Sequence, residues 1–163
     1  MKALRWYAAR DLRYEEVPEP DPGSGEVKIK IALAGICGTD VREYSTGPYM
    51  IPEGMSPLTL GHEFSGTVAA AGDGVAGFRP GDRVTALGYR YCGGCWCCMR
   101  MKYNICCNQG FSGLTVDGCM AGYMTTPEYN CFRVPDAVSD EWACLTEPLS
   151  VALHAVKRGN VRP

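Results

Sequence analysis

The sequence predicts a mainly β fold with a few helices, arranged as a partly open β-barrel. The 163 residues include 20 glycines and 11 prolines, which is typical of a chain with many turns. Several short segments alternate apolar and polar residues with the period of two of a half-buried strand, whereas only one late segment has helical spacing. A chain of this length predicts one domain, residues 1–163, with a substantial core.

The expected elements follow one another along the chain. A hairpin over residues 1–14 precedes a loop, because the three prolines between Val17 and Gly23 lack the amide donor that a strand ladder needs. Later strands, each bounded by glycine or proline, are expected at residues 27–33, 67–71, 83–87, 121–125 and 131–134. A helix is expected at about 147–158, with Thr146 as a candidate N-cap and Gly159 as its end.

The most informative stretch runs from Tyr91 to Asn108 and contains six of the ten cysteines. Four of them form the pattern C-x2-C-x2-C-x7-C, namely Cys92, Cys95, Cys98 and Cys106. Four thiolates at such short spacings can surround one zinc ion tetrahedrally, at about 2.3 Å from the metal. The Gly93–Gly94 pair lets the backbone between the first two cysteines turn tightly. The spacing therefore predicts a structural zinc lobe over residues 91–108.

Two alternatives to this ligand set stay open at the sequence level. The first is a disulfide-bonded lobe. The N-terminal residues contain no apolar run typical of a secretory signal, so we expect the reducing cytoplasm, where metal binding is favoured. The second is a different ligand set, in which Cys97 and Cys107 replace Cys98 and Cys106.

Composition argues against two classes of partner. The formal net charge is -2, and the lysines and arginines are scattered, so no basic surface for nucleic acid is expected. No stretch approaches the roughly 18 apolar residues of a membrane-spanning helix. We therefore expect neither nucleic acid nor a membrane as a partner.

A second metal site is suggested where predicted strands meet glycines. A catalytic zinc ion typically has three protein ligands and one open position. Cys37 and His62 could supply two ligands, and either Glu63 or Glu147 the third. Taken alone, His62 could equally be a hydrogen-bonded structural histidine, Glu147 a carboxylate that interacts with a helix dipole, and Asp40 a turn residue. Spacing by itself does not bring these groups together.

Several motifs occur in an order that resembles the zinc-dependent medium-chain alcohol dehydrogenases, and they extend over essentially the whole chain. They are C-G-T-D at 37–40, G-H-E-F-S-G at 61–66, the four-cysteine lobe, and E-P-L-S-V-A-L-H-A-V at 147–156. G-P-Y-M-I-P at 47–52 and the glutamate at 147 are most similar to the 2,3-butanediol and sorbitol (polyol) branch. The resemblance implies the GroES-like catalytic domain of these enzymes and a secondary alcohol or vicinal diol as substrate, oxidised to a ketone.

The resemblance also implies roles for individual residues. Cys37 and His62 match ligands of the catalytic zinc, and Glu63 matches a glutamate that in this branch binds zinc or exchanges with water. Glu147 stands where other branches have a third ligand. Thr39 matches the hydroxyl that takes the substrate proton, and Asp40 a carboxylate that orients the ligand histidine. The second zinc ion would be structural, held by Cys92, Cys95, Cys98 and Cys106.

The sequence departs from the family pattern at the proton relay. Many relatives continue C-G-T-D-x-H, and that histidine passes the proton to solvent. Arg42 occupies the position here, and an arginine stays protonated at any working pH. The proton therefore leaves by another route, or Thr39 passes it on directly.

The cofactor-binding half of the resembling enzymes has no counterpart in these residues. In the family, the late helix leads into a Rossmann domain, whose G-x-G-x-x-G turn holds the pyrophosphate of NAD(P). The glycines at 35–38 and 72–74 do not continue into a βαβ unit. We expect a chain that binds two zinc ions but is inactive without a Rossmann-domain polypeptide or a homo-oligomeric partner. A non-catalytic zinc-binding scaffold, or a split-gene module that needs a partner chain, is the alternative.

Overall fold

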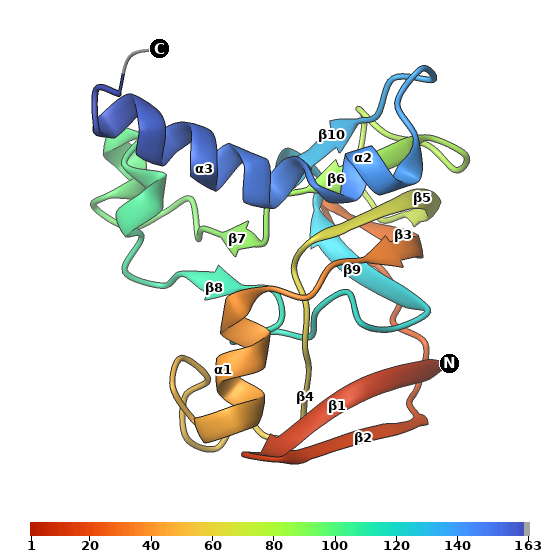
Figure 1. Ribbon diagram of the computed structural model, residues 1–163. Coiled ribbons are helices and arrows are strands. Elements are labelled where there is room, and N and C mark those ends of the chain that lie inside the picture. The colour runs from red at the N-terminus through yellow and green to blue at the C-terminus, as the bar shows by residue number, and fades with distance from the viewer. Residues whose placement is uncertain (162–163) are drawn as a thin grey trace.

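The computed structural model, which describes residues 1–161, has two separate antiparallel sheets and a projecting lobe (Figure 1). Residues 162–163 of the predicted domain lie outside the described residues. The larger sheet has the strand order β10-β6-β5-β3-β9. Its strands are β3 (Glu26–Ala34), β5 (Phe64–Ala71), β6 (Arg83–Ala86), β9 (Tyr123–Pro127) and β10 (Cys131–Arg133). Because the sheets do not close on each other, the predicted mainly β, partly open fold class is confirmed.

The smaller sheet contains the predicted opening hairpin. Strands β1 (Lys2–Ala8) and β2 (Asp11–Glu16) pair in antiparallel register, and the short β4 (Leu58–Thr59) pairs with the other edge of β1. The hairpin lies at the opposite end of the molecule from the two C-terminal helices (Figure 1). The chain between β4 and β5 therefore passes from one sheet to the other.

The structure contains two helices that the sequence analysis did not predict. Helix α1 (Gly38–Thr46) begins directly after Cys37, and the short α2 (Asp140–Cys144) packs against β3 and β5. The predicted C-terminal helix is α3 (Thr146–Arg158). Thr146 lies inside this helix and is not its N-cap, because only Leu145 separates α2 from α3 and serves as the N-cap.

One glycine-rich segment satisfies the dinucleotide-binding pattern by spacing alone. Gly72, Gly74 and Gly77 give G-x-G-x-x-G, but this segment links β5 to β6, which pair in antiparallel register. The phosphate-binding turn needs a strand followed by a helix, whose N-terminus faces the phosphate. The segment is thus an ordinary connection within the sheet.

The core consists of two buried clusters, and one residue from each flanks the predicted site residues His62 and Glu63 in the sequence. The first lies on the large sheet and includes Val27, Ile29 and Phe64; the second lies under the hairpin and includes Trp6 and Leu60. Leu60 and Phe64 are each 1% exposed. The segment between them, which carries the G-H-E motif, is therefore held at both ends by buried side chains.

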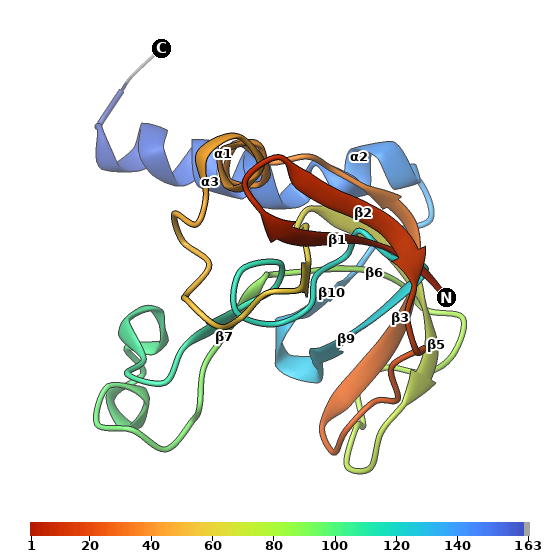
Figure 2. The same ribbon diagram turned by 90° about the horizontal axis from the view of Figure 1, so that it is seen from below.

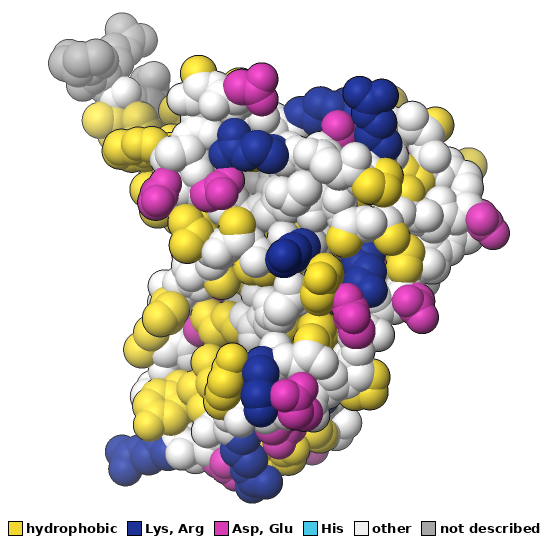
Figure 3. All heavy atoms as spheres, turned by 90° about the vertical axis from the view of Figure 1, so that its right-hand side faces the viewer, with side chains coloured by type: hydrophobic (Ala, Val, Ile, Leu, Met, Phe, Trp, Pro, Cys, Tyr) yellow, Lys and Arg dark blue, Asp and Glu magenta, His cyan; other side chains and the backbone are white. Residues whose placement is uncertain are grey.

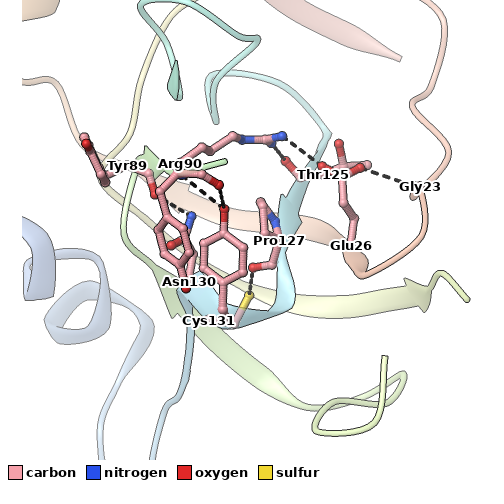
Figure 4. A network of polar contacts seen from close by, with 10 residues as sticks. Gly23, Glu26, Tyr89, Arg90, Thr125, Pro127, Asn130 and Cys131 are labelled. Atoms are coloured by element: carbon pink, nitrogen blue, oxygen red, sulfur yellow. Dashed lines mark hydrogen bonds and ion pairs between the residues drawn. The ribbon is translucent and has the colours of Figure 1, made fainter. Parts of the chain in front are cut away.

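The cysteine lobe projects from the body of the protein (Figure 2) and includes the short strands β7 (Tyr89–Arg90) and β8 (Gly110–Phe111). A polar network at its base ties it to the large sheet (Figure 4). The Arg90 guanidinium lies 2.8 Å from the Glu26 carboxylate and donates to the Thr125 carbonyl at 2.5 Å. The Asn130 amide donates to the Tyr89 carbonyl at 2.6 Å. These bonds fix the direction in which the lobe leaves the sheet.

Charged side chains of both signs are interspersed over the face drawn in Figure 3. This distribution matches the formal net charge of -2. In the part of the chain that the structure describes, none of the helices is long and apolar enough to traverse a bilayer.

The carboxylate of Glu43 holds the loop after α1 in place, which leads to a first prediction. Glu43 is fully buried and accepts hydrogen bonds from the backbone N–H groups of Tyr49, Met50 and Ile51. Glu43→Ala leaves these donors without an acceptor, so we expect a loss of about 2–4 kcal/mol in the free energy of unfolding. Urea denaturation measures the loss. Glu53→Ala, which changes an exposed glutamate of the same loop, should change stability by less than about 0.5 kcal/mol. Equal stability of the two variants would contradict the assigned role.

Candidate zinc centres

The structure brings Cys37 together with the adjacent pair His62 and Glu63, which lies far from it in the sequence. One candidate ligand atom from each residue lies within 4.8 Å of the other two. His62 is 3% and Glu63 8% exposed, and Cys37 is half-buried. The cluster offers a thiolate, an imidazole and a carboxylate, all of which are ligands of zinc.

Asp40 ties together the two segments that carry these residues. One of its carboxylate oxygens accepts a hydrogen bond from the Cys37 N–H at 2.9 Å, and the other accepts from the Gly61 N–H at 3.2 Å. The first bond also belongs to the N-terminal capping of α1, in which Cys37 is the N-cap. The predicted role of Asp40 is to orient the ligand histidine, and the hydrogen bonds that the structure shows run to the backbone on both sides of the site.

Close packing of the backbone around Gly61 positions the adjacent His62. Gly61 has φ +94°, a conformation that favours glycine, and its carbonyl accepts from the Cys119 N–H at 3.0 Å. A Cβ atom on Gly113 would lie 2.6 Å from the Gly61 nitrogen, so only glycine fits there. The Phe111 ring meets the His62 ring edge-on, with centroids 5.0 Å apart. The His62 ring therefore packs against Phe111, a contact that the sequence did not predict.

Two buried thiols support Glu63. Cys119 Sγ lies 3.5 Å and Cys144 Sγ 3.6 Å from the Glu63 backbone carbonyl, in donor geometry. Burial raises the pKa of both thiols, so both stay protonated and able to donate. On the opposite side, a Cβ atom on Gly35 would overlap the Glu63 carboxylate. Nothing in the spacing of these residues pointed to this arrangement.

Two polar atoms in the site lack partners. Thr39 Oγ1 and His62 Nδ1 are buried and have no hydrogen-bond partner among the described residues. Buried polar atoms are normally paired, and an unpaired one costs about 1–3 kcal/mol. A substrate hydroxyl would satisfy Thr39 Oγ1, and the thiolate, imidazole and carboxylate of the cluster offer a zinc ion its donors. The residues present therefore fit the metal that the donor set suggests.

Glu147 lies near the cluster but outside it. It is not among the three residues whose ligand atoms lie within 4.8 Å of one another. Burial raises the pKa of its carboxyl group, the nearby His62 lowers it, and the negative charge of Glu63 raises it again. The side chain also borders a mostly apolar cavity of about 220 Å³, beside Leu87 and Phe132.

The lobe brings the predicted four cysteines into one cluster. The sulfur atoms of Cys92, Cys95, Cys98 and Cys106 lie within 4.8 Å of one another. Backbone N–H donors lower the pKa of Cys95 to about 5, whereas burial raises the pKa of Cys98 to about 12. Thiols this close cannot all ionise unless a cation lies between them. Zinc would supply that charge, so this cluster also fits the metal.

Comparison with known proteins identifies the class of protein. Residues 23–136 match the family described as the alcohol dehydrogenase GroES-like domain. The chain therefore belongs to the zinc-dependent medium-chain alcohol dehydrogenases and contains their GroES-like domain, as the motifs predicted.

The relatives include the polyol and butanediol branch. Sorbitol dehydrogenase from Halalkalibacterium halodurans is 40% identical over 164 residues, which cover 99% of this chain and 47% of that protein. The crystal structure of 2R,3R-butanediol dehydrogenase from Bacillus subtilis has a TM-score of 0.87 at 39% identity, covering 96% of this chain and 46% of that one. A putative zinc-binding dehydrogenase from Sinorhizobium meliloti 1021, bound to NADP, has a TM-score of 0.86 at 33% identity, covering 96% and 44%. The chain spans about half the length of these relatives.

The Asp40 bridge generates a second prediction. Asp40→Asn removes the charge and one acceptor, so one of the two backbone segments is released. We expect zinc affinity at the Cys37 cluster to fall about 10- to 100-fold, as it does when partners of metal ligands are removed elsewhere. Competition with a chromophoric chelator measures the affinity. The exposed Asp136→Asn is the matched control, and zinc bound in the lobe should be unchanged in both variants. Wild-type affinity in Asp40→Asn would show that the bridge does not position the ligands.

Proposed function

We propose that this chain is the zinc-binding catalytic domain of an NAD(P)-dependent dehydrogenase that oxidises a secondary alcohol or vicinal diol, of the 2,3-butanediol or sorbitol type, to a ketone. The observation that carries the proposal is the convergence of Cys37, His62 and Glu63 at one buried point. Three protein ligands leave one coordination position for the substrate. The sorbitol and butanediol dehydrogenases among the relatives support this substrate class.

Under this proposal the cluster of Cys37, His62 and Glu63 binds the metal, and Thr39 takes part in proton transfer. A zinc ion held by the cluster would act as a Lewis acid and lower the pKa of an alcohol hydroxyl group. Thr39 Oγ1, in the first turn of α1 and without a partner among the residues described, would accept a hydrogen bond from that hydroxyl and pass its own proton on to water as the alcohol proton is transferred to it. Arg42 does not continue the relay as a base. Its guanidinium stacks on Tyr49, 3.5 Å from the ring centroid.

We assign the third ligand position to Glu63 and a supporting role to Glu147. Glu63 belongs to the cluster, and its backbone carbonyl accepts hydrogen bonds from the Gly35 N–H and the Cys119 thiol. Glu147, whose pKa responds to the charges of His62 and Glu63, would take the place of Glu63 when that carboxylate moves off the metal. The four lobe cysteines would hold the second, structural zinc ion.

The cofactor is assigned to a part of the enzyme outside these residues. The chain spans about half of its relatives, one of which is bound to NADP. Among the described residues, α3 has no buried member, and Leu149, Val151, Leu153 and Val156 are between 47% and 67% exposed. Such an apolar helix suits a surface on which a cofactor-binding domain packs, in the same polypeptide, in a partner or in a homo-oligomer. The abundance of thiols suits the reducing cytoplasm.

A chimera tests the proposed reaction directly. Residues 1–160 would be joined to the remaining half of the Bacillus subtilis butanediol dehydrogenase. We expect zinc-dependent oxidation of 2,3-butanediol with NAD, followed as NADH absorbance. Cys37→Ala should lower kcat/KM by about 10³-fold or more, because Lewis-acid stabilisation amounts to several kcal/mol. Cys131→Ala is the matched control, because Cys131 belongs to none of the candidate metal clusters.

Two outcomes would contradict the proposal. A folded chimera that binds zinc and NADH but does not oxidise diols would leave a zinc-binding scaffold as the better account. Robust oxidation by residues 1–163 alone would show that no separate cofactor domain is needed.

A further inference from the structure

We propose that the cysteine lobe binds a second zinc ion through Cys97 and Cys107, with Cys95 as a bridging ligand shared with the four-cysteine site. The sulfur atoms of Cys95, Cys97 and Cys107 form a separate group whose members lie within 4.8 Å of one another. Neither Cys97 nor Cys107 belongs to the four-cysteine cluster. The lobe would then hold two zinc ions on six thiolates.

The sequence arrangement separates the two ligand sets. Cys97 and Cys98 are neighbours, as are Cys106 and Cys107, and one member of each pair faces each cluster. The one-turn helix Cys98–Arg100 maintains this division, because the Cys97 carbonyl accepts from the N–H groups of Arg100 and Lys102, both at 3.0 Å. Cys95 belongs to both groups. The two candidate sites therefore share Cys95 as a common ligand.

The dimensions suit a thiolate-bound ion. In a tetrahedron with zinc–sulfur distances of about 2.3 Å, neighbouring sulfurs lie about 3.8 Å apart. The three sulfur atoms lie at most 4.8 Å apart, so each sulfur–sulfur distance needs to shorten by no more than about 1 Å for the three to bind one ion. Cys97 is buried and Cys107 is exposed, so the fourth position would face solvent and take a water molecule.

Charge favours a divalent ion. One Zn²⁺ with four thiolates carries a net charge of about −2, and a second Zn²⁺ with two further thiolates adds no net charge. A monovalent ion such as Cu⁺ would instead leave one more negative charge in the same small volume. Binding would release the protons of the Cys97 and Cys107 thiols to solvent.

Cadmium NMR tests the bridge. Cadmium replaces zinc in thiolate sites and gives one resonance per ion, and two ions that share a sulfur show scalar coupling to each other. In the cadmium-loaded chain we expect two mutually coupled resonances from the lobe. In the double variant Cys97→Ser/Cys107→Ser one of the pair should disappear and the other remain as an uncoupled signal, which also shows that the lobe still folds. Cys131→Ala should retain the coupled pair.

Zinc content gives an independent readout. After equilibration in a zinc buffer, the double variant should contain one zinc ion fewer per chain than the wild-type protein and Cys131→Ala. Equal zinc content in all three proteins, or uncoupled cadmium resonances in the wild-type chain, would overturn the proposal. A disulfide between Cys97 and Cys107 in protein prepared with zinc present would also overturn it.

Discussion

The candidate metal cluster of Cys37, His62 and Glu63 depends on one carboxylate that joins two distant parts of the chain. Asp40 is 3% exposed and accepts from the backbone N–H groups of Cys37 and Gly61. Hydrogen bonds to a charged group contribute about 1.5–3 kcal/mol each, so the bridge offsets much of the cost of burying the charge. Burial raises the pKa of Asp40, and the hydrogen bond from Cys37 and the nearby His62 act in the opposite direction. A positive metal centre would favour its ionised form further.

The rest of the fold keeps these two segments close. Cys37 ends the turn after β3 and starts α1, while the G-H-E segment runs between the two buried clusters. Glycines at 61 and 113 allow a loop to pack directly against the backbone of that segment. A side chain at Gly113 would clash with the Gly61 backbone, directly before His62. The site therefore rests on backbone packing as much as on its ligands.

Most of the elements that the sequence predicted correctly were predicted from local patterns of residues. The strand at β3 was predictable because Val27 and Ile29 alternate with polar residues and one face is buried. The four-cysteine lobe was predictable because all its ligands lie within one short stretch. Resemblance, and not spacing, pointed to Cys37, His62 and Glu63 as one site.

The elements that escaped prediction depend on contacts between distant residues. Helix α1 has no apolar stripe; buried Asp40 and Glu43 and the hydrogen bond from the Trp6 indole to the Glu43 carbonyl stabilise it. The support of Glu63 by Cys119 and Cys144 likewise joins segments that only the folded chain brings together. The same holds for the grouping of Cys107 with Cys95 and Cys97, which follows from the path of the lobe.

We propose that Cys37, His62 and Glu63 hold a metal ion with one position open to an alcohol. The most direct measurement is the visible absorption spectrum of protein whose lobe is filled with zinc and whose remaining site is filled with Co²⁺. We expect the spectrum of a four-coordinate ion with one thiolate ligand, a shift on adding a secondary alcohol, and loss of the signal in Cys37→Ser. A six-coordinate spectrum that neither the alcohol nor the substitution changes would contradict it.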